Sequence, residues 1–103
     1  MIALAYFNQA HGSMLYGYSP GDDLVPTALD EIVTREQTPE GAASVVFELL
    51  NRDDRPNGRI ERSLSVGDVV RVDVPADHDG GTGYRVWLAC EPIGWRSIEE
   101  PAA

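Results

Sequence analysis

The chain has 103 residues, and its 17 acidic and eight basic residues give a formal charge of −9. This length predicts one domain, and the 43% hydrophobic and 24% charged content opposes wholesale disorder. The charge opposes binding to nucleic acid or to an anionic membrane, because each phosphate contact needs a positive partner. No stretch reaches the roughly 18 apolar residues of a membrane span. Residues 1–7 are apolar but lack the basic lead-in of a signal peptide, so we expect a cytoplasmic protein.

Two short apolar runs, residues 2–7 and 14–18, open the chain. Turn-forming residues separate them, and this pattern predicts a β-hairpin. Residues 19–23 predict a second turn. The apolar residues within 24–33 fit a helical stripe and an irregular strand about equally well, and Pro26 followed by Thr27 is compatible with a helix start. The residues of this segment leave both alternatives open.

A helix is predicted from residue 38 to about residue 51. Thr38 is a good N-cap, Pro39 suits the first helical position, and Glu40 complements the positive end of the helix dipole. Asn51 is a plausible C-terminal stop. The helical spacing i, i+3, i+4 and i+7 gives one buried face, made of Ala43, Val46, Phe47 and Leu50.

Strands are predicted at residues 69–74, 84–90 and 95–98, with polar or glycine-rich segments between them. The expected architecture is therefore α+β: a mostly antiparallel, curved sheet of about five or six strands with one helix packed on one face. We expect a single domain over residues 1–98 and a frayed tail over 99–103. The predicted core combines the apolar faces of the helix and strands: Ala43, Val46, Phe47, Leu50, Val70, Val72, Val86, Leu88 and Trp95.

Few residues offer catalytic chemistry. Cys90 forms the one cysteine–histidine combination, with His11 or His78. Cys90 falls on the inward face of its predicted strand, where cysteine packs as a small hydrophobe. Residues 77–81 are similar to a calcium loop but lack its third ligand and its closing glutamate. We therefore expect no enzymatic activity, no metal site and no cofactor.

Two features are candidates for binding a partner protein. Four arginines make the loop 52–62 net +1 in a chain of charge −9, and they form a candidate docking patch: Arg52, Arg55, Arg59 and Arg62. Trp87, predicted on the strand face opposite the core, is a candidate anchor. A structural role is favoured for the turn before residue 69, in which Gly67 supplies an unusual backbone angle and Ser65 or Asp68 braces the turn.

Three sequence pieces carry a resemblance to a known family: residues 47–51 (Phe-Glu-Leu-Leu-Asn), residues 62–70 (Arg-Ser-Leu-Ser-Val-Gly-Asp-Val-Val) and the pair Gly94-Trp95. In this combination the chain resembles the YodL-like family, which includes small actinobacterial proteins and modules of large polyvalent proteins of phages and conjugative elements. The resemblance covers roughly residues 40 to 98. It implies a strand before the helix, which favours a strand at 24–33, and an accessory role in transfer or host conflict. It implies no established activity.

We expect a non-enzymatic interaction module that binds another protein and is encoded by a phage or conjugative element. Two alternatives stay open. One is an acidic DNA-mimicking inhibitor of the anti-restriction type, suggested by the charge of −9. The other is a small-ligand binder or enzyme whose site assembles only in three dimensions. The sequence does not decide whether the chain forms a homodimer.

Overall fold

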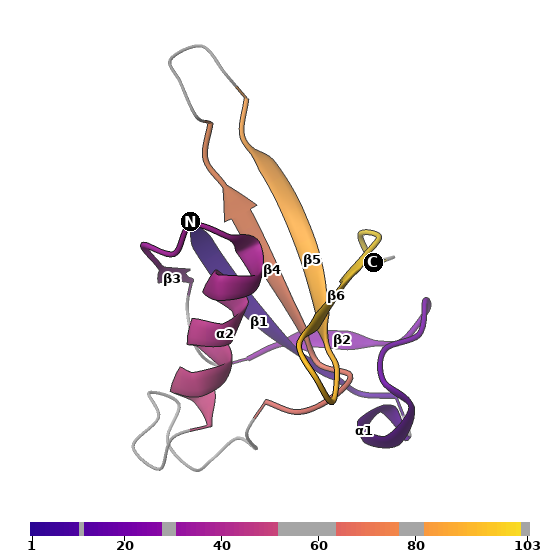
Figure 1. The fold of residues 1–103 in the computed structure, drawn as a ribbon. Coiled ribbons are helices and arrows are strands. Elements are labelled where there is room, and N and C mark those ends of the chain that lie inside the picture. Colours follow the sequence, from indigo (N-terminus) through magenta and orange to yellow (C-terminus); the bar gives the residue numbers. More distant parts are fainter. Residues whose placement is uncertain (11, 28–30, 52–63, 77–81, 102–103) are drawn as a thin grey trace.

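The computed structural model describes residues 1–10, 12–27, 31–51, 64–76 and 82–101 (Figure 1). The predicted arginine loop and both histidines lie outside these residues. No helix in the described ranges is long and apolar enough to cross a membrane. The elements in chain order are β1 (Ile2–Asn8), α1 (Ser13–Tyr16), β2 (Leu24–Pro26), β3 (Ile32–Val33), α2 (Pro39–Leu50), β4 (Val69–Val74), β5 (Tyr84–Cys90) and β6 (Trp95–Ile98).

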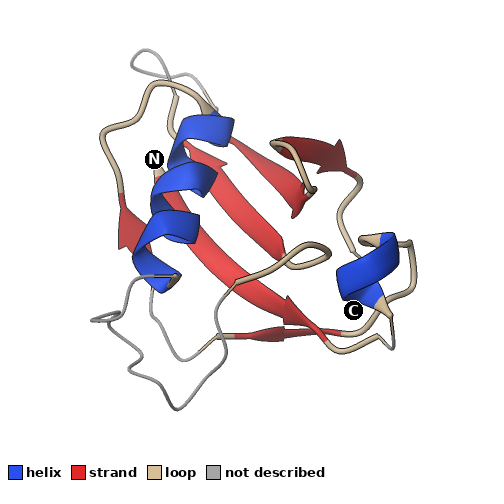
Figure 2. Ribbon diagram, turned by 60° about the horizontal axis from the view of Figure 1, so that its bottom comes forward, coloured by secondary structure: helices blue, strands red, loops and turns tan. Residues whose placement is uncertain are grey.

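The strands form one antiparallel sheet in the order β2-β1-β4-β5-β6, and β3 also pairs with β1. Val25 of β2 lies opposite Phe7, near the end of β1, and Val33 of β3 lies opposite Ile2, at its start. The ambiguous segment 24–33 therefore contributes strands at both of its ends, along one edge of the sheet. With α2 packed on the sheet, the predicted α+β class is confirmed (Figure 2).

Helix α2 begins and ends where local signals predict. The Thr38 hydroxyl accepts a hydrogen bond from the Gly41 amide at 3.0 Å, Pro39 is the first helical residue, and Asn51 is the C-cap. The helix crosses one face of the sheet above β1 and β4 (Figure 1). Small side chains on both surfaces permit this close packing, and the buried set includes Ala3, Ala5, Ala42, Ala43, Val46, Leu50, Val70, Val72 and Leu88.

Three predicted core residues lie at the border of this core. Phe47, Val86 and Trp95 are only partly buried and pack against it. The rings of Phe47 and Trp95 meet edge to face, with centroids 6.2 Å apart and planes at 87°. The Trp95 indole N–H also donates to the Ser44 hydroxyl at 3.1 Å. This aromatic pair closes the gap between α2 and the last hairpin of the sheet.

The predicted N-terminal hairpin is wrong. Residues 13–16 form the short helix α1, and the strand that pairs with this end of β1 is β2. Gly12 and Gly17 flank α1 with φ values of 82° and 78°, so the chain turns sharply on both sides of it. A five-residue apolar run does not distinguish a strand from a helical turn by periodicity alone.

The sheet face turned away from α2, called the open face below, carries a second and smaller apolar cluster. It consists of Tyr18, Val69 and Ala89, with Leu24, Trp87 and Ile98 packed against them. Residues 17–23, which follow α1, cover one end of this face through Tyr18. Strand alternation places the arginines of β4, β5 and β6 here: Arg71, Arg85 and Arg96.

Candidate functional site

The turn before β4 is held by Gly67. Its φ of 90° is disfavoured for other residues, and a Cβ at this position would lie 2.6 Å from the Ser13 carbonyl oxygen. The Gly67 amide donates to the Cys90 carbonyl at 2.9 Å. Gly67 therefore lets the turn touch α1 on one side and bond to the end of β5 on the other.

The Asp68 carboxylate braces the same turn. One oxygen accepts from the Ser65 amide at 2.7 Å, and the other accepts from the Asn8 amide at 2.8 Å. The Asn8 side chain in turn donates to the Gly67 carbonyl at 3.0 Å. Asp68 is almost completely buried, and bonds to a charged acceptor are among the stronger hydrogen bonds. The roles expected of Gly67 and Asp68 in the turn are therefore present, together with a link to β1 across 60 residues.

Cys90 is buried beside this turn. Burial, together with the carboxylates of Asp68 and Glu91, raises the pKa of the Cys90 thiol to about 11. The thiol is consequently protonated at neutral pH and a poor nucleophile. Among the described residues, no three His, Cys, Asp or Glu side chains come together as a metal-binding group.

A pocket of about 310 Å³ lies on the open face and is called the open-face pocket. Its floor is aromatic: the rings of Tyr6 and Trp87 are 5.5 Å apart and inclined at 40°. Arg71 lies opposite Trp87 in the sheet register, and Leu24 of β2 adds an apolar wall. Three neighbouring strands, one edge strand and the residues Glu100 and Pro101 after β6 thus line the pocket, which combines apolar surface with guanidinium groups.

The electrostatics of the open-face pocket centre on one shared carboxylate. Asp73 accepts from Arg85 at 2.8 Å and from Arg71 at 3.3 Å. Hydrogen bonding to Asp73 is the main reason that the pKa of Arg85 is raised, and the charges of Asp73 and Glu100 add to it. Among the described residues, the other polar contacts of Arg71 are long, at 3.5 Å to the Tyr6 hydroxyl and 3.9 Å to Glu31. Only 16% of the Arg71 side chain is exposed, so this cation is largely buried, and its partners in the described part of the chain are weak.

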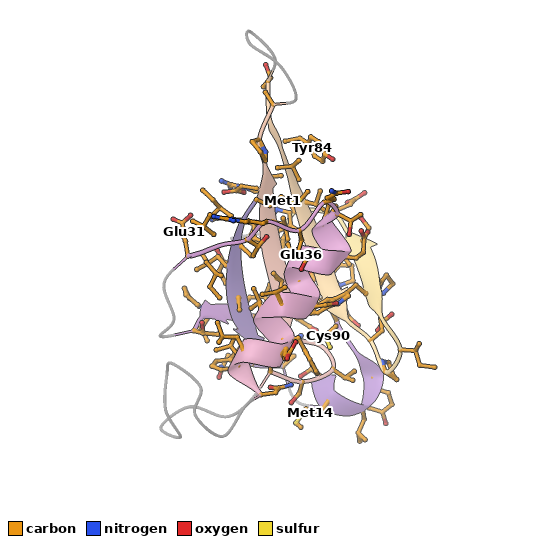
Figure 3. The ribbon with its side chains drawn as sticks, turned by 60° about the vertical axis from the view of Figure 1, so that its left-hand side comes forward. Met1, Met14, Glu31, Glu36, Tyr84 and Cys90 are labelled. Atoms are coloured by element: carbon orange, nitrogen blue, oxygen red, sulfur yellow. The ribbon has the colours of Figure 1, made fainter. Side chains whose placement is uncertain are left out.

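A second surface lies at the end of the sheet where β4 begins and β5 ends. In Figure 3, Met14 of α1 and Cys90 lie toward the same end of the molecule, and Met1 and Tyr84 lie toward the other end. Four large apolar side chains project into solvent here, with exposed fractions of 60% for Met14, 81% for Leu15, 84% for Tyr16 and 95% for Ile93. We call these four residues the apolar end. The contact between Gly67 and Ser13 places α1 at this end, and the hydrogen bond from Glu91 to Gly94 shapes the turn that carries Ile93.

The structure describes only one of the five predicted partner-binding residues. Trp87 is partly exposed and lines the open-face pocket, whereas Arg52, Arg55, Arg59 and Arg62 lie outside the described residues. Sequence reasoning missed Arg71 and Tyr6 as neighbours of Trp87. It also missed the exposed apolar side chains of α1, although Gly12 and Gly17 on either side of that run were a signal for a break in the strand pattern.

Known proteins provide no further assignment. No protein-family model, no curated protein and no solved structure matches the chain.

Proposed function

We propose that the protein is a non-enzymatic interaction module that binds another protein through the apolar end. The observation that carries this proposal is the run of three consecutive apolar residues on α1, each more than half exposed, at the same end of the sheet as the almost fully exposed Ile93. Isolated apolar residues are common on protein surfaces, but several large, exposed apolar side chains at one end of a molecule are more typical of an interaction site.

The fold presents these side chains on a fixed support. Gly17 donates to the Ser13 carbonyl at 2.8 Å, and Ser13 is buried against the Gly67 turn. The Asn8 side chain further accepts from the Ala10 amide at 2.8 Å just before α1. Because the backbone of α1 is held from both sides, a partner would not have to order it on binding, which lowers the entropic cost of association.

Two features support the non-enzymatic part of the proposal. The Cys90 thiol is buried with a raised pKa, and the buried carboxylate of Asp68 is bonded to backbone amides. These two groups, which have the chemistry of a nucleophile and a base, are therefore committed to the fold. An accessory role for a phage or conjugative element, and membership of the YodL-like family, rest on the resemblance of residues 40–98 and belong to the same proposal.

The DNA-mimic alternative receives less support from the surface. Three of the four arginines within the described ranges lie on the open face and pair with acidic side chains there or at its rim, as Arg85 does with Asp73 and Arg96 does with Glu91. A DNA mimic needs carboxylates that are free to act as phosphate substitutes.

Site-specific photo-cross-linking tests the proposal. A photoreactive phenylalanine analogue is placed at position 15 of the apolar end, and a matched control carries it at position 33 in β3, where Val33 is 79% exposed at the other end of β1. In cells that encode the protein, position 15 is expected to give a specific protein adduct that position 33 does not give. An adduct of twice the chain mass would identify a second copy as the partner.

The identified partner then allows an affinity measurement. The double variant Leu15→Ser/Tyr16→Ser is expected to bind it at least about ten-fold more weakly, because exposed apolar and aromatic anchors carry most of the energy of an interface. Val33→Ser is expected to bind unchanged. Identical adducts from both positions, or equal binding by both variants, would refute the proposal.

A further inference from the structure

The open-face pocket is separate from the apolar end and carries different chemistry. We propose that it is a second binding site, which takes an extended peptide segment with a glutamate directly before a proline. In the structure as described, the chain's own Glu100 and Pro101 form one wall of this pocket. This inference goes beyond the proposed function and does not use the residues of the apolar end.

The guanidinium groups on the charged side of the pocket do not use all of their hydrogen-bonding capacity within the described residues. Arg71 and Arg85 share the carboxylate of Asp73, and the shortest polar contact of Arg71 with a described residue is 3.3 Å, whereas strong guanidinium–carboxylate bonds are about 2.7–2.9 Å long. The Arg71 Nε atom is buried and has no hydrogen-bond partner among the described residues. A largely buried cation with weak contacts favours an additional carboxylate at the exposed ends of the guanidinium groups.

The apolar side of the pocket suits a proline ring. Tyr6 and Trp87 form a tilted, partly exposed aromatic floor, and Leu24 packs against the same apolar cluster as Trp87. Aromatic-lined grooves are the usual binding surface for proline-rich extended segments, because such segments lose little conformational entropy on binding. The carboxylate and the ring must be adjacent in the ligand, since Arg71 lies directly opposite Trp87 in the sheet.

The tail of the chain carries these two groups in this order, and both residues line the pocket. Ile98 of β6 pairs with Trp87 of β5, so residues 99–101 leave the sheet beside the pocket. Pro101 is partly buried there, and the charge of Glu100 contributes to the raised pKa of Arg85. A tethered segment acts at an effective concentration in the millimolar range. A second peptide of the same chemistry therefore has to compete with the tail.

Tryptophan fluorescence tests the site in the full chain. The substitution Trp95→Phe leaves Trp87 as the only indole. The probe is an acetylated and amidated peptide, Ile-Glu-Glu-Pro-Ala-Ala, and the control peptide carries glutamine in place of both glutamates. We expect the probe to change Trp87 emission. It should bind the tail variant Glu100→Gln/Pro101→Gly about ten-fold more tightly than it binds the protein with the unchanged tail, because the substitutions weaken the tethered competitor. The glutamine peptide should bind about ten-fold more weakly than the probe.

Two arginine variants test which arginine binds the carboxylate of the peptide. Arg85 is about half exposed, so Arg85→Gln is compatible with folding, and it should weaken peptide binding about ten-fold. Arg96→Gln is the matched control, because Arg96 lies on the same face but bonds to Glu91 and to the Tyr18 carbonyl. It should leave peptide binding unchanged. Circular dichroism checks that each variant is folded.

Four results would overturn the proposal. The first is that millimolar probe peptide leaves Trp87 emission unchanged in both the unchanged chain and the tail variant. The second is that the glutamine peptide binds as tightly as the probe, and the third is that Arg85→Gln and Arg96→Gln have the same effect on binding. The fourth is that free glutamate changes the emission as much as the probe does, which would indicate a site for small carboxylates. Cross-linking from position 15 is expected to be unaffected by the tail variant. The two proposed sites can therefore fail independently.

Discussion

The contact between the Gly67 turn and α1 leads to a stability prediction with an internal control. Substitution of Gly67 by alanine would place a Cβ atom 2.6 Å from the Ser13 carbonyl oxygen, and this oxygen belongs to the backbone. Substitution of Gly94, which has a similar φ of 76°, would place a Cβ with no atom of the described residues within 4 Å apart from its chain neighbours. The two variants share the backbone strain of a left-handed residue and differ in the steric clash.

The magnitudes follow from these two terms. A left-handed conformation costs a non-glycine residue about 1–2 kcal/mol, and the reduced entropy of the unfolded chain offsets part of this cost. We therefore expect Gly94→Ala to lower the free energy of unfolding by about 1 kcal/mol. Overpacking adds about 1–3 kcal/mol, so that Gly67→Ala should lower it by about 2–4 kcal/mol.

Urea unfolding, followed by circular dichroism, measures both values. With a slope of about 1–3 kcal/mol per molar urea, the midpoints of the two variants should differ by on the order of 1 M. Equal destabilisation by the two substitutions would mean that the turn and α1 do not meet as closely as described. A larger effect at Gly94 would refute the reasoning altogether.

Three further substitutions test other parts of the fold. Asp68→Asn should lower the free energy of unfolding by about 2–3 kcal/mol, because an amide offers one acceptor oxygen where two backbone amides donate. Leu50→Ala should cost about 2–5 kcal/mol and more than Phe47→Ala, although phenylalanine is larger, because Leu50 is fully buried and Phe47 only partly so. Burial raises the pKa of Cys90 above its unfolded value, so the thiol stabilises the fold below about pH 8.5, and this contribution, on the order of 2 kcal/mol, is lost as the pH rises to about 11. All three are measured by urea unfolding, the last as the difference between the unsubstituted chain and Cys90→Ala from pH 8 to 11.

Each of these expectations has a contrary outcome. An effect of Asp68→Asn below about 0.5 kcal/mol would mean that the buried carboxylate is not needed as a double acceptor. A larger loss for Phe47→Ala than for Leu50→Ala would place the centre of the core at the aromatic pair rather than beneath α2. If Cys90→Ala shows the same alkaline loss of stability as the unsubstituted chain, the thiol does not cause it.

Local signals in the sequence were sufficient to predict the helix and strands whose residues have strong local preferences. Thr38 and Pro39 define the start of α2, and its apolar spacing defines the buried face. Alternation in β4 and β5 correctly assigns Val70 and Leu88 to the core side and Trp87 to the other side. These assignments depend only on residues within a few positions of each other, so they do not require knowledge of the strand order.

The candidate site depends on information that local patterns lack. Arg71 and Trp87 become neighbours through the register of β4 and β5, and Tyr6 joins them because β1 pairs with β4. The bond from the Asn8 amide to Asp68 spans 60 residues. In α1, a short apolar run fits a strand and a helical turn equally well, and the choice depends on the flanking glycines and on the competing strand β2. In each of these cases the outcome depended on contacts between residues that are distant in the sequence.

The two proposed surfaces depend on different parts of β5, so a single substitution can affect one surface and leave the other intact. The Gly67 turn bonds to Cys90 at the end of β5 and supports α1, whereas Trp87 near its middle pairs with Ile98 and directs the tail to the open-face pocket. A Gly67→Ala protein that remains folded should therefore lose affinity at the apolar end, because α1 is displaced. It should retain peptide binding at the open-face pocket, because the register of β5 with β6 does not involve this turn. Loss of both activities in the folded variant would show that the two surfaces are coupled through the sheet.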